Sequence, residues 1–256
     1  MLQRITTISW YTALEAIRGK LFWLVAGIAL FCLMLGFFIG ELAITESAMA
    51  QGSICAALLR LSAVFIVALF AINTVSQDLQ AQRIDTLLAL RLTRAEYAFG
   101  KFFAFCLIAW MIAACMSVSL LLFLSAGQVL GWGISLVLEL CIVVAFALFC
   151  AISLNQMTMA VIVVMGFYIL ARSINAIQLM VNTPVINNMS SANEIMRLLV
   201  DLMQMVLPNL DYFTQTAWLT YGVGDGLPLV GILLQTLIYC ALLMSAALFD
   251  LYRKEF

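Results

Sequence analysis

The chain has 256 residues, of which 66% are hydrophobic and only 10% carry a charge. Soluble globular proteins are about 45–50% apolar and about 25% charged, so this composition excludes an ordinary soluble domain. The formal net charge of -1 carries no information about partners, and nucleic acid is not expected as one.

The first predicted element is an amphipathic helix over residues 4–19. We expect it to lie in the membrane interface, as an elbow before the first span. Its apolar residues recur at helical spacing: Ile5, Ile8, Tyr11, Leu14 and Ile17. A cleavable signal is not expected, because the apolar run after Lys20 is too long and lacks the usual small-residue cleavage site.

Six apolar runs are long enough to cross about 30 Å of hydrocarbon at about 1.5 Å per residue. We place them near residues 21–40, 54–75, 99–124, 131–153, 157–180 and 228–249. Only Leu154, Asn155 and Gln156 separate the fourth run from the fifth, which predicts a tight hairpin rather than one long segment. The expected fold class is an all-α membrane protein with six transmembrane helices, forming a single transmembrane domain over residues 1–256.

Positive charge is distributed unevenly about these spans. Nine of the twelve lysines and arginines lie before the first span, between the second and third, or after the sixth. The loops on the opposite side, 41–53 and 125–130, carry none. The positive-inside rule therefore predicts that both termini are cytoplasmic.

The segment between the second and third spans is the most charged part of the chain. Residues 78–92 predict a short amphipathic helix with Ile84, Leu87 and Leu88 at helical spacing. Its other faces carry Gln80, Arg83 and Asp85. Two interpretations stay open, a solvated loop and a docking helix that sits in a groove of a partner protein.

The sequence Thr93-Arg94-Ala95-Glu96 predicts a capping box. In this motif the threonine hydroxyl accepts a bond from the Glu96 amide, and the Glu96 side chain reaches back to the Thr93 amide. The helix of the third span should therefore begin near Arg94, and the helix before it should end near Leu92.

These residues resemble a run common in permeases of the ABC-2 family of ATP-binding cassette (ABC) transporters, T-[IL]-D-x-L-L-A-x-P-[IL]-S-R-x-E-Y-x-x-G-K. The chain matches it, with Thr93 in place of serine, at Ile84, Asp85, Leu87, Leu88, Ala89, Leu92, Thr93, Arg94, Glu96, Tyr97, Gly100 and Lys101. It departs at Arg91, where the family usually has proline, and at Arg83, where threonine is frequent. Without that proline, a continuous helix through residue 91 is favoured.

The resemblance implies the membrane-spanning permease subunit of an ABC transporter, of exporter type, in a bacterial inner membrane. Segment 78–92 would then be the coupling helix that contacts a separate ABC ATPase subunit. The resemblance implies these coupling residues: Arg83, Asp85, Leu87, Leu88, Arg94 and Glu96.

The other implied partners are membrane lipid and a second copy of the chain or a paralogous permease, with room for a periplasmic accessory protein. The chain itself is not expected to be an enzyme, and ATP and magnesium would belong to the ATPase. Gly19-Lys20 and Gly100-Lys101 lack both the upstream glycine and the following hydroxyl residue of a phosphate-binding loop.

Three charged residues, Arg60, Glu139 and Arg172, fall within predicted spans and share one layer in the outer half. A charge at mid-helix costs at least about 2.5–3.5 kcal/mol, so such residues usually pair or face a cavity. We predict that Glu139 pairs with Arg60 or Arg172. The pair would either hold the bundle together or form a polar wall for substrate.

Residues 181–227 form a long loop on the outer side, with a second capping box at Ser191-Ala192-Asn193-Glu194 and a helix that Pro208 ends. Two short helices dipping into the outer leaflet are expected here. They would act as a structural lid or contact the transported molecule.

The chain has seven cysteines and no histidine. The cysteines lack C-x-x-C spacing and lie mostly within spans, where we expect them to pack as small apolar residues. No catalytic residue, metal ligand or cofactor-binding residue is expected. The main alternative function is an ATP-independent secondary transporter or channel, but the internal repeats with broken spans that it predicts are not evident.

Overall fold

A computed structural model describes residues 2–42, 47–80, 93–154, 156–182, 198, 200–204, 207–214 and 229–253. Every regular element in these ranges is helical, which confirms the all-α prediction. The elements are α1 (Leu2–Arg18), α2 (Leu21–Leu42), α3 (Ser47–Gln80), α5 (Arg94–Leu120), α6 (Ala126–Ser153), α7 (Met157–Asn182), the 3-10 helix η2 (Leu210–Thr214) and α10 (Leu229–Arg253).

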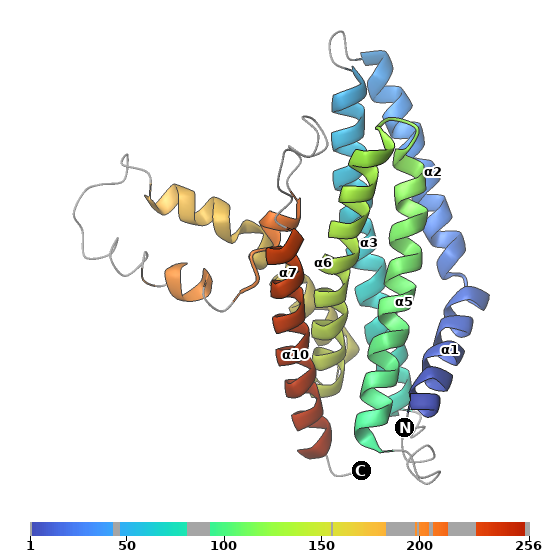
Figure 1. The fold of residues 1–256 in the computed structure, drawn as a ribbon, viewed down its shortest axis with the longest axis vertical. Coiled ribbons are helices and arrows are strands. Elements are labelled where there is room, and N and C mark those ends of the chain that lie inside the picture. Colours follow the sequence, from blue (N-terminus) through green and yellow to red (C-terminus); the bar gives the residue numbers. More distant parts are fainter. Residues whose placement is uncertain are drawn as a thin grey trace.

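Six of these helices, α2, α3, α5, α6, α7 and α10, are long and apolar enough to cross a membrane. This confirms the number of predicted spans. The N-terminal end of α1 and the C-terminal end of α10 lie at the same end of the bundle (Figure 1). We call this the terminal end and the opposite one the distal end.

Several helices extend beyond the predicted apolar runs. The second span was expected to stop near residue 75, with a separate helix from residue 78, but α3 continues to Gln80. The reason is that hydropathy detects only the apolar part of a helix, whereas backbone hydrogen bonding continues through polar residues. The tight connection after the fourth span is confirmed, since α6 ends at Ser153 and α7 begins at Met157.

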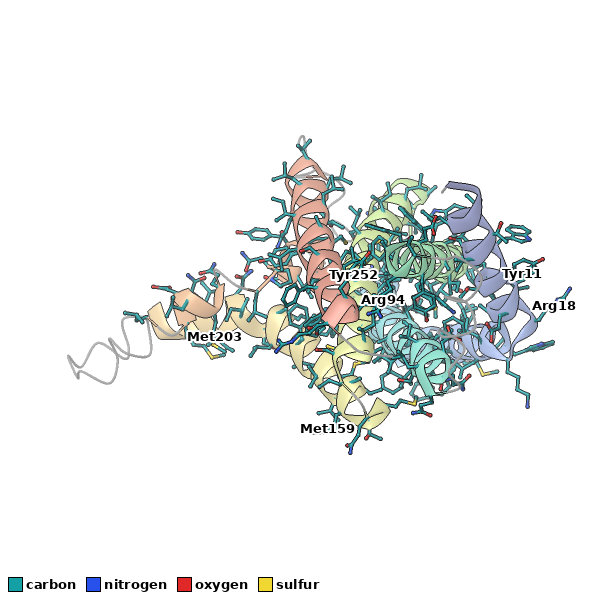
Figure 2. All side chains as sticks on the ribbon, turned by 90° about the horizontal axis from the view of Figure 1, so that it is seen from below. Tyr11, Arg18, Arg94, Met159, Met203 and Tyr252 are labelled. Carbon is teal, nitrogen blue, oxygen red and sulfur yellow. The ribbon has the colours of Figure 1, made fainter. Side chains whose placement is uncertain are left out.

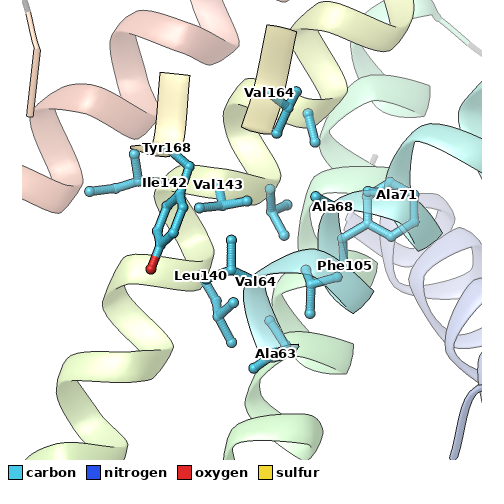
Figure 3. Packing of buried hydrophobic residues seen from close by; sticks show 14 of the residues in the cluster. Ala63, Val64, Ala68, Ala71, Phe105, Leu140, Ile142, Val143, Val164 and Tyr168 are labelled. Carbon is cyan, nitrogen blue, oxygen red and sulfur yellow. The ribbon is translucent and has the colours of Figure 1, made fainter. Parts of the chain in front are cut away.

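Helix α6 is the centre of the bundle and packs against α3, α5, α7 and α10. Of its most apolar 18 residues 67% are buried, against 22% in α2. Figure 3 shows the contact with α3, where Ala63, Val64 and Ala68 face Leu140 and Val143 of α6. Small side chains of this kind allow membrane helices to approach closely.

Helix α1 leans against the first turns of α5 (Figure 1). The predicted amphipathic helix is therefore present, but its most buried residues are small: Thr12, Ala13 and Ala16. Tyr11, which was assigned to the apolar stripe, is 68% exposed and points away from the bundle (Figure 2). Whether α1 lies in a membrane interface stays a prediction.

Helix α7 slants outward, so that its C-terminal part stands apart from the other spans (Figures 1 and 2). Leu179 and Met180 in this part are 74% and 66% exposed. Of the expected outer-loop helices, Leu198 and residues 200–204 are helical and η2 follows Pro208. The capping box at 191–194 lies outside the described residues.

Candidate functional site: two polar clusters in the bundle

Two groups of polar side chains interrupt the apolar packing. The junction cluster lies at the terminal end, where α3 ends and α5 begins. It consists of Ser9, Asp78, Thr93, Arg94, Glu96, Tyr97 and Lys101. The intramembrane layer lies between α3, α6, α7 and η2. It consists of Arg60, Ser135, Glu139, Tyr168 and Arg172. The junction cluster flanks residues 81–92, so four of the predicted coupling residues lie outside the described residues: Arg83, Asp85, Leu87 and Leu88.

The capping box at the start of α5 is confirmed. Thr93 is the N-cap in an extended conformation, and its hydroxyl accepts a hydrogen bond from the Glu96 amide at 3.3 Å. The Thr93 amide donates to Glu96 Oε2 at 2.9 Å. Glu96 is only 4% exposed. Its carboxylate therefore fixes where α5 begins, a role that the sequence pattern alone predicts.

Asp78 joins the last turn of α3 to α5. Its Oδ2 accepts hydrogen bonds from Lys101 Nζ at 2.7 Å and from the Tyr97 hydroxyl at 3.0 Å. The side chains of Lys101 and Asp78 are 7% and 10% exposed. A charge this deeply buried is stable only when it is paired and hydrogen-bonded, and the two bonds to Asp78 meet that requirement. The two helices that flank residues 81–92 are thus directly connected.

Arg94 connects the same junction to the last helix of the chain. Its Nη1 donates to the carbonyl oxygens of Leu251 at 2.7 Å and Tyr252 at 3.3 Å, in the last turn of α10. Carbonyls in the last turn of a helix have no partner within the helix, and a cation is favoured there by the helix dipole. Figure 2, which looks onto this end, shows Arg94 beside Tyr252.

A close backbone approach brings α1 to the junction cluster as well. Ser9 Oγ lies within hydrogen-bond distance of two carbonyl oxygens, that of Ile5 in α1 at 2.8 Å and that of Gly100 in α5 at 3.0 Å, and its single proton is shared between them. A Cβ atom on Gly100 would lie 2.9 Å from Ile8 Cγ2, so a larger residue at position 100 would displace α1. Helices α1, α3, α5 and α10 therefore all meet around the two ends of residues 81–92.

Sequence reasoning predicted the capping role of Glu96, while the coupling role given to Arg94 and Glu96 stays a prediction. It missed the bonds from Arg94 to α10 and the pairing of Asp78 with Tyr97 and Lys101. A usable signal was present. Tyr97 and Lys101 are four residues apart and so share one face of a helix. Asp78 is the acidic residue at the facing end of the preceding span.

In the intramembrane layer, Glu139 forms a buried ion pair with Arg60, through Arg60 Nη1 and Glu139 Oε2. This confirms the prediction that Glu139 pairs with an arginine of the same layer and identifies which one. The Arg60 and Glu139 side chains are 3% and 0% exposed. Arg60 also donates to Ser135 Oγ at 2.9 Å and to the Phe213 carbonyl oxygen at 3.1 Å, which links α3 and α6 to η2.

Arg172 occupies a different position. Its Nη1 donates to the Tyr168 hydroxyl at 3.0 Å, one turn back on α7. Tyr168 is 1% exposed and packs beside Ile142 of α6 (Figure 3). It is also close enough to Glu139 for the two side chains to interact electrostatically. Arg172 is half-buried and makes no ion pair with any residue in the described ranges.

Two buried acceptors in the described structure have no hydrogen-bond partner, Glu139 Oε1 and Asn209 Oδ1. No group of three or more His, Cys, Asp or Glu side chains able to hold a metal ion occurs in the part of the chain that the structure describes. The described residues of the layer therefore offer no metal-binding cluster.

The chain matches no protein-family model and no curated protein sequence.

Proposed function

We propose that this chain is the membrane-spanning permease subunit of an ABC transporter of exporter type, located in a bacterial inner membrane. The six spans and the position of both termini at one end of the bundle support a multi-pass protein with both termini cytoplasmic. The excess of lysine and arginine in the segments at that end supports the same orientation.

The observation that carries the proposal is that hydrogen bonds and an ion pair of the junction cluster connect four helices around residues 81–92. Residues 81–92 connect the end of α3 at Gln80 to Thr93, the N-cap of α5, and Asp78 in the last turn of α3 is bonded to Lys101 and Tyr97 of α5. Arg94 adds α10, and the Ser9 bond adds α1. A force applied to this short segment would therefore reach four helices at once.

A separate ABC ATPase would supply that force. In this proposal Leu87 and Leu88 fill a groove of the ATPase, Arg83 and Asp85 orient the segment, and ATP and magnesium bind to the partner alone. ATP can drive the permease only because the two conformations of the complex bind it with different affinity. A second copy of the chain, or a paralogous permease, would complete the transporter.

We assign the Arg60–Glu139 pair to holding the bundle rather than to contacting substrate. Both side chains are almost completely buried, and Arg60 is further bonded to Ser135 and to the backbone of η2. The pair would keep η2 attached to α3 and α6 in this conformation.

Affinity purification of the tagged chain from its native host tests the proposal. A second polypeptide with a phosphate-binding loop should co-purify in a near-equal molar ratio, and the complex should hydrolyse ATP. Recovery of the chain without any ATPase, together with transport that needs no nucleotide, would instead favour an ATP-independent transporter or channel.

A further inference from the structure

We propose that Arg172 is the centre of a binding site for a phosphate-type anion, either the headgroup of a lipid in the leaflet at the distal end or a soluble anion. The inference rests on the six membrane spans and on the contacts of Arg172. It does not depend on the partner ATPase, so the two proposals can fail separately.

The two arginines of the intramembrane layer differ in their hydrogen-bond and ion-pair partners. Arg60 is 3% exposed, and Glu139, Ser135 and the Phe213 carbonyl accept its hydrogen bonds. Arg172 has the Tyr168 hydroxyl as its hydrogen-bond acceptor, and no carboxylate of the described residues pairs with it. A guanidinium group has five N–H donors and cannot lose its charge in a protein, so Arg172 retains both charge and donors for a ligand.

Arg172 is also partly accessible from outside the bundle. Arg172 is half-buried on α7, the helix that slants away from the bundle (Figures 1 and 2). Ile169, three residues before it, is 59% exposed. The guanidinium group is therefore reachable from the surroundings of the bundle, which for a spanning helix are lipid, and long arginine side chains extend toward the headgroup region.

The contact with Tyr168 holds the Arg172 guanidinium group in place. The Tyr168 hydroxyl is fixed, since its ring is 1% exposed and packed against α6, and it holds the guanidinium from one side. Asp211 on η2 accepts a hydrogen bond from Asn175 at 3.3 Å, one turn along α7, and forms no ion pair with Arg172. A planar guanidinium fork binds phosphate through two parallel hydrogen bonds, so phosphate fits this site better than a monodentate acceptor.

The test uses the full-length protein, with any co-purifying subunit, and follows its melting midpoint during titration. The three additions are phosphatidylglycerol, phosphatidylcholine and inorganic phosphate. Phosphatidylglycerol should raise the midpoint of the wild type, and Arg172→Gln should raise the half-saturating concentration about tenfold or more, as expected for the loss of charge-assisted hydrogen bonds. A response to phospholipid but not to inorganic phosphate identifies a lipid headgroup, and an equal response to inorganic phosphate identifies a soluble anion.

The matched control is Arg18→Gln, which removes an exposed arginine at the end of α1 and should leave the titration unchanged. If Arg172→Gln does not fold, Tyr168→Phe and Arg172→Lys serve instead, and each should weaken the response while keeping the charge. Equal titrations for the wild type and these variants would overturn the proposal.

Discussion

Replacing Glu139 with alanine should lower the free energy of unfolding by about 3–5 kcal/mol, the typical result of removing one partner of a buried ion pair. Glu139 is 0% exposed and is the carboxylate that neutralises Arg60. Without it the Arg60 charge would stay buried, and the bonds from Arg60 to Ser135 and η2 would hold a guanidinium group with no counter-charge.

Thermal unfolding of the purified protein in detergent measures this effect, with size-exclusion chromatography as the readout of the folded fraction at each temperature. At roughly 2–4 °C per kcal/mol for a chain of this size, the melting midpoint should fall by roughly 10 °C. Glu15→Gln, which neutralises an exposed carboxylate on α1, is the control and should change little. The double variant Arg60→Met/Glu139→Leu should recover most of the loss, because apolar replacement of a whole buried pair is often neutral.

Glu139→Gln is the more demanding variant, since it keeps the shape and removes only the charge. If it changes neither the melting midpoint nor transport, the ion pair does not hold these helices together, and the role assigned to it here is wrong.

The largest functional effect is expected from Leu87→Asp/Leu88→Asp. In the proposed complex these two leucines are buried in a groove of the ATPase, and burying two unpaired carboxylates there would be strongly unfavourable. We expect loss of permease-stimulated ATP hydrolysis and of transport, with normal membrane insertion. The measurements are ATPase activity of the reconstituted complex and the amount of folded permease in membranes.

A matched variant separates this effect from that of added charge. Gln80→Asp/Gln82→Asp places the same two carboxylates in the same segment, at residues that are already polar. Stimulated hydrolysis should largely survive in it. Normal coupling in Leu87→Asp/Leu88→Asp would refute the assignment of the coupling segment, whatever the control shows.

The local features of the fold could be predicted because their determinants are adjacent in sequence. The Thr93–Glu96 capping box is one example, since both partners lie within one turn and the motif sets the first residue of α5. The number of spans is another, because each needs only an apolar run of sufficient length.

Contacts between helices were harder to predict. The position of a residue in its span indicates its depth in the membrane, but it does not indicate which other helix lies beside it. Arg60 and Arg172 lie at similar depth, so the sequence left both open as partners of Glu139, and the packing of α3 on α6 selects Arg60. The Asp78–Lys101 pair was missed for the same reason. The outward position of Tyr11 was missed because α1 packs through small residues rather than through its largest apolar ones.

The central claim is that a partner ATPase binds residues 81–92 from the cytoplasm, and photo-crosslinking in intact cells tests it most directly. A photoreactive amino acid at position 88 should give one major product, the permease joined to a protein with a phosphate-binding loop. The same group at position 121, in the turn between α5 and α6 at the distal end, should not give that product. Failure to capture an ATPase at position 88, together with labelling of a cysteine at that position by a membrane-impermeant reagent added outside the cell, would contradict the claim.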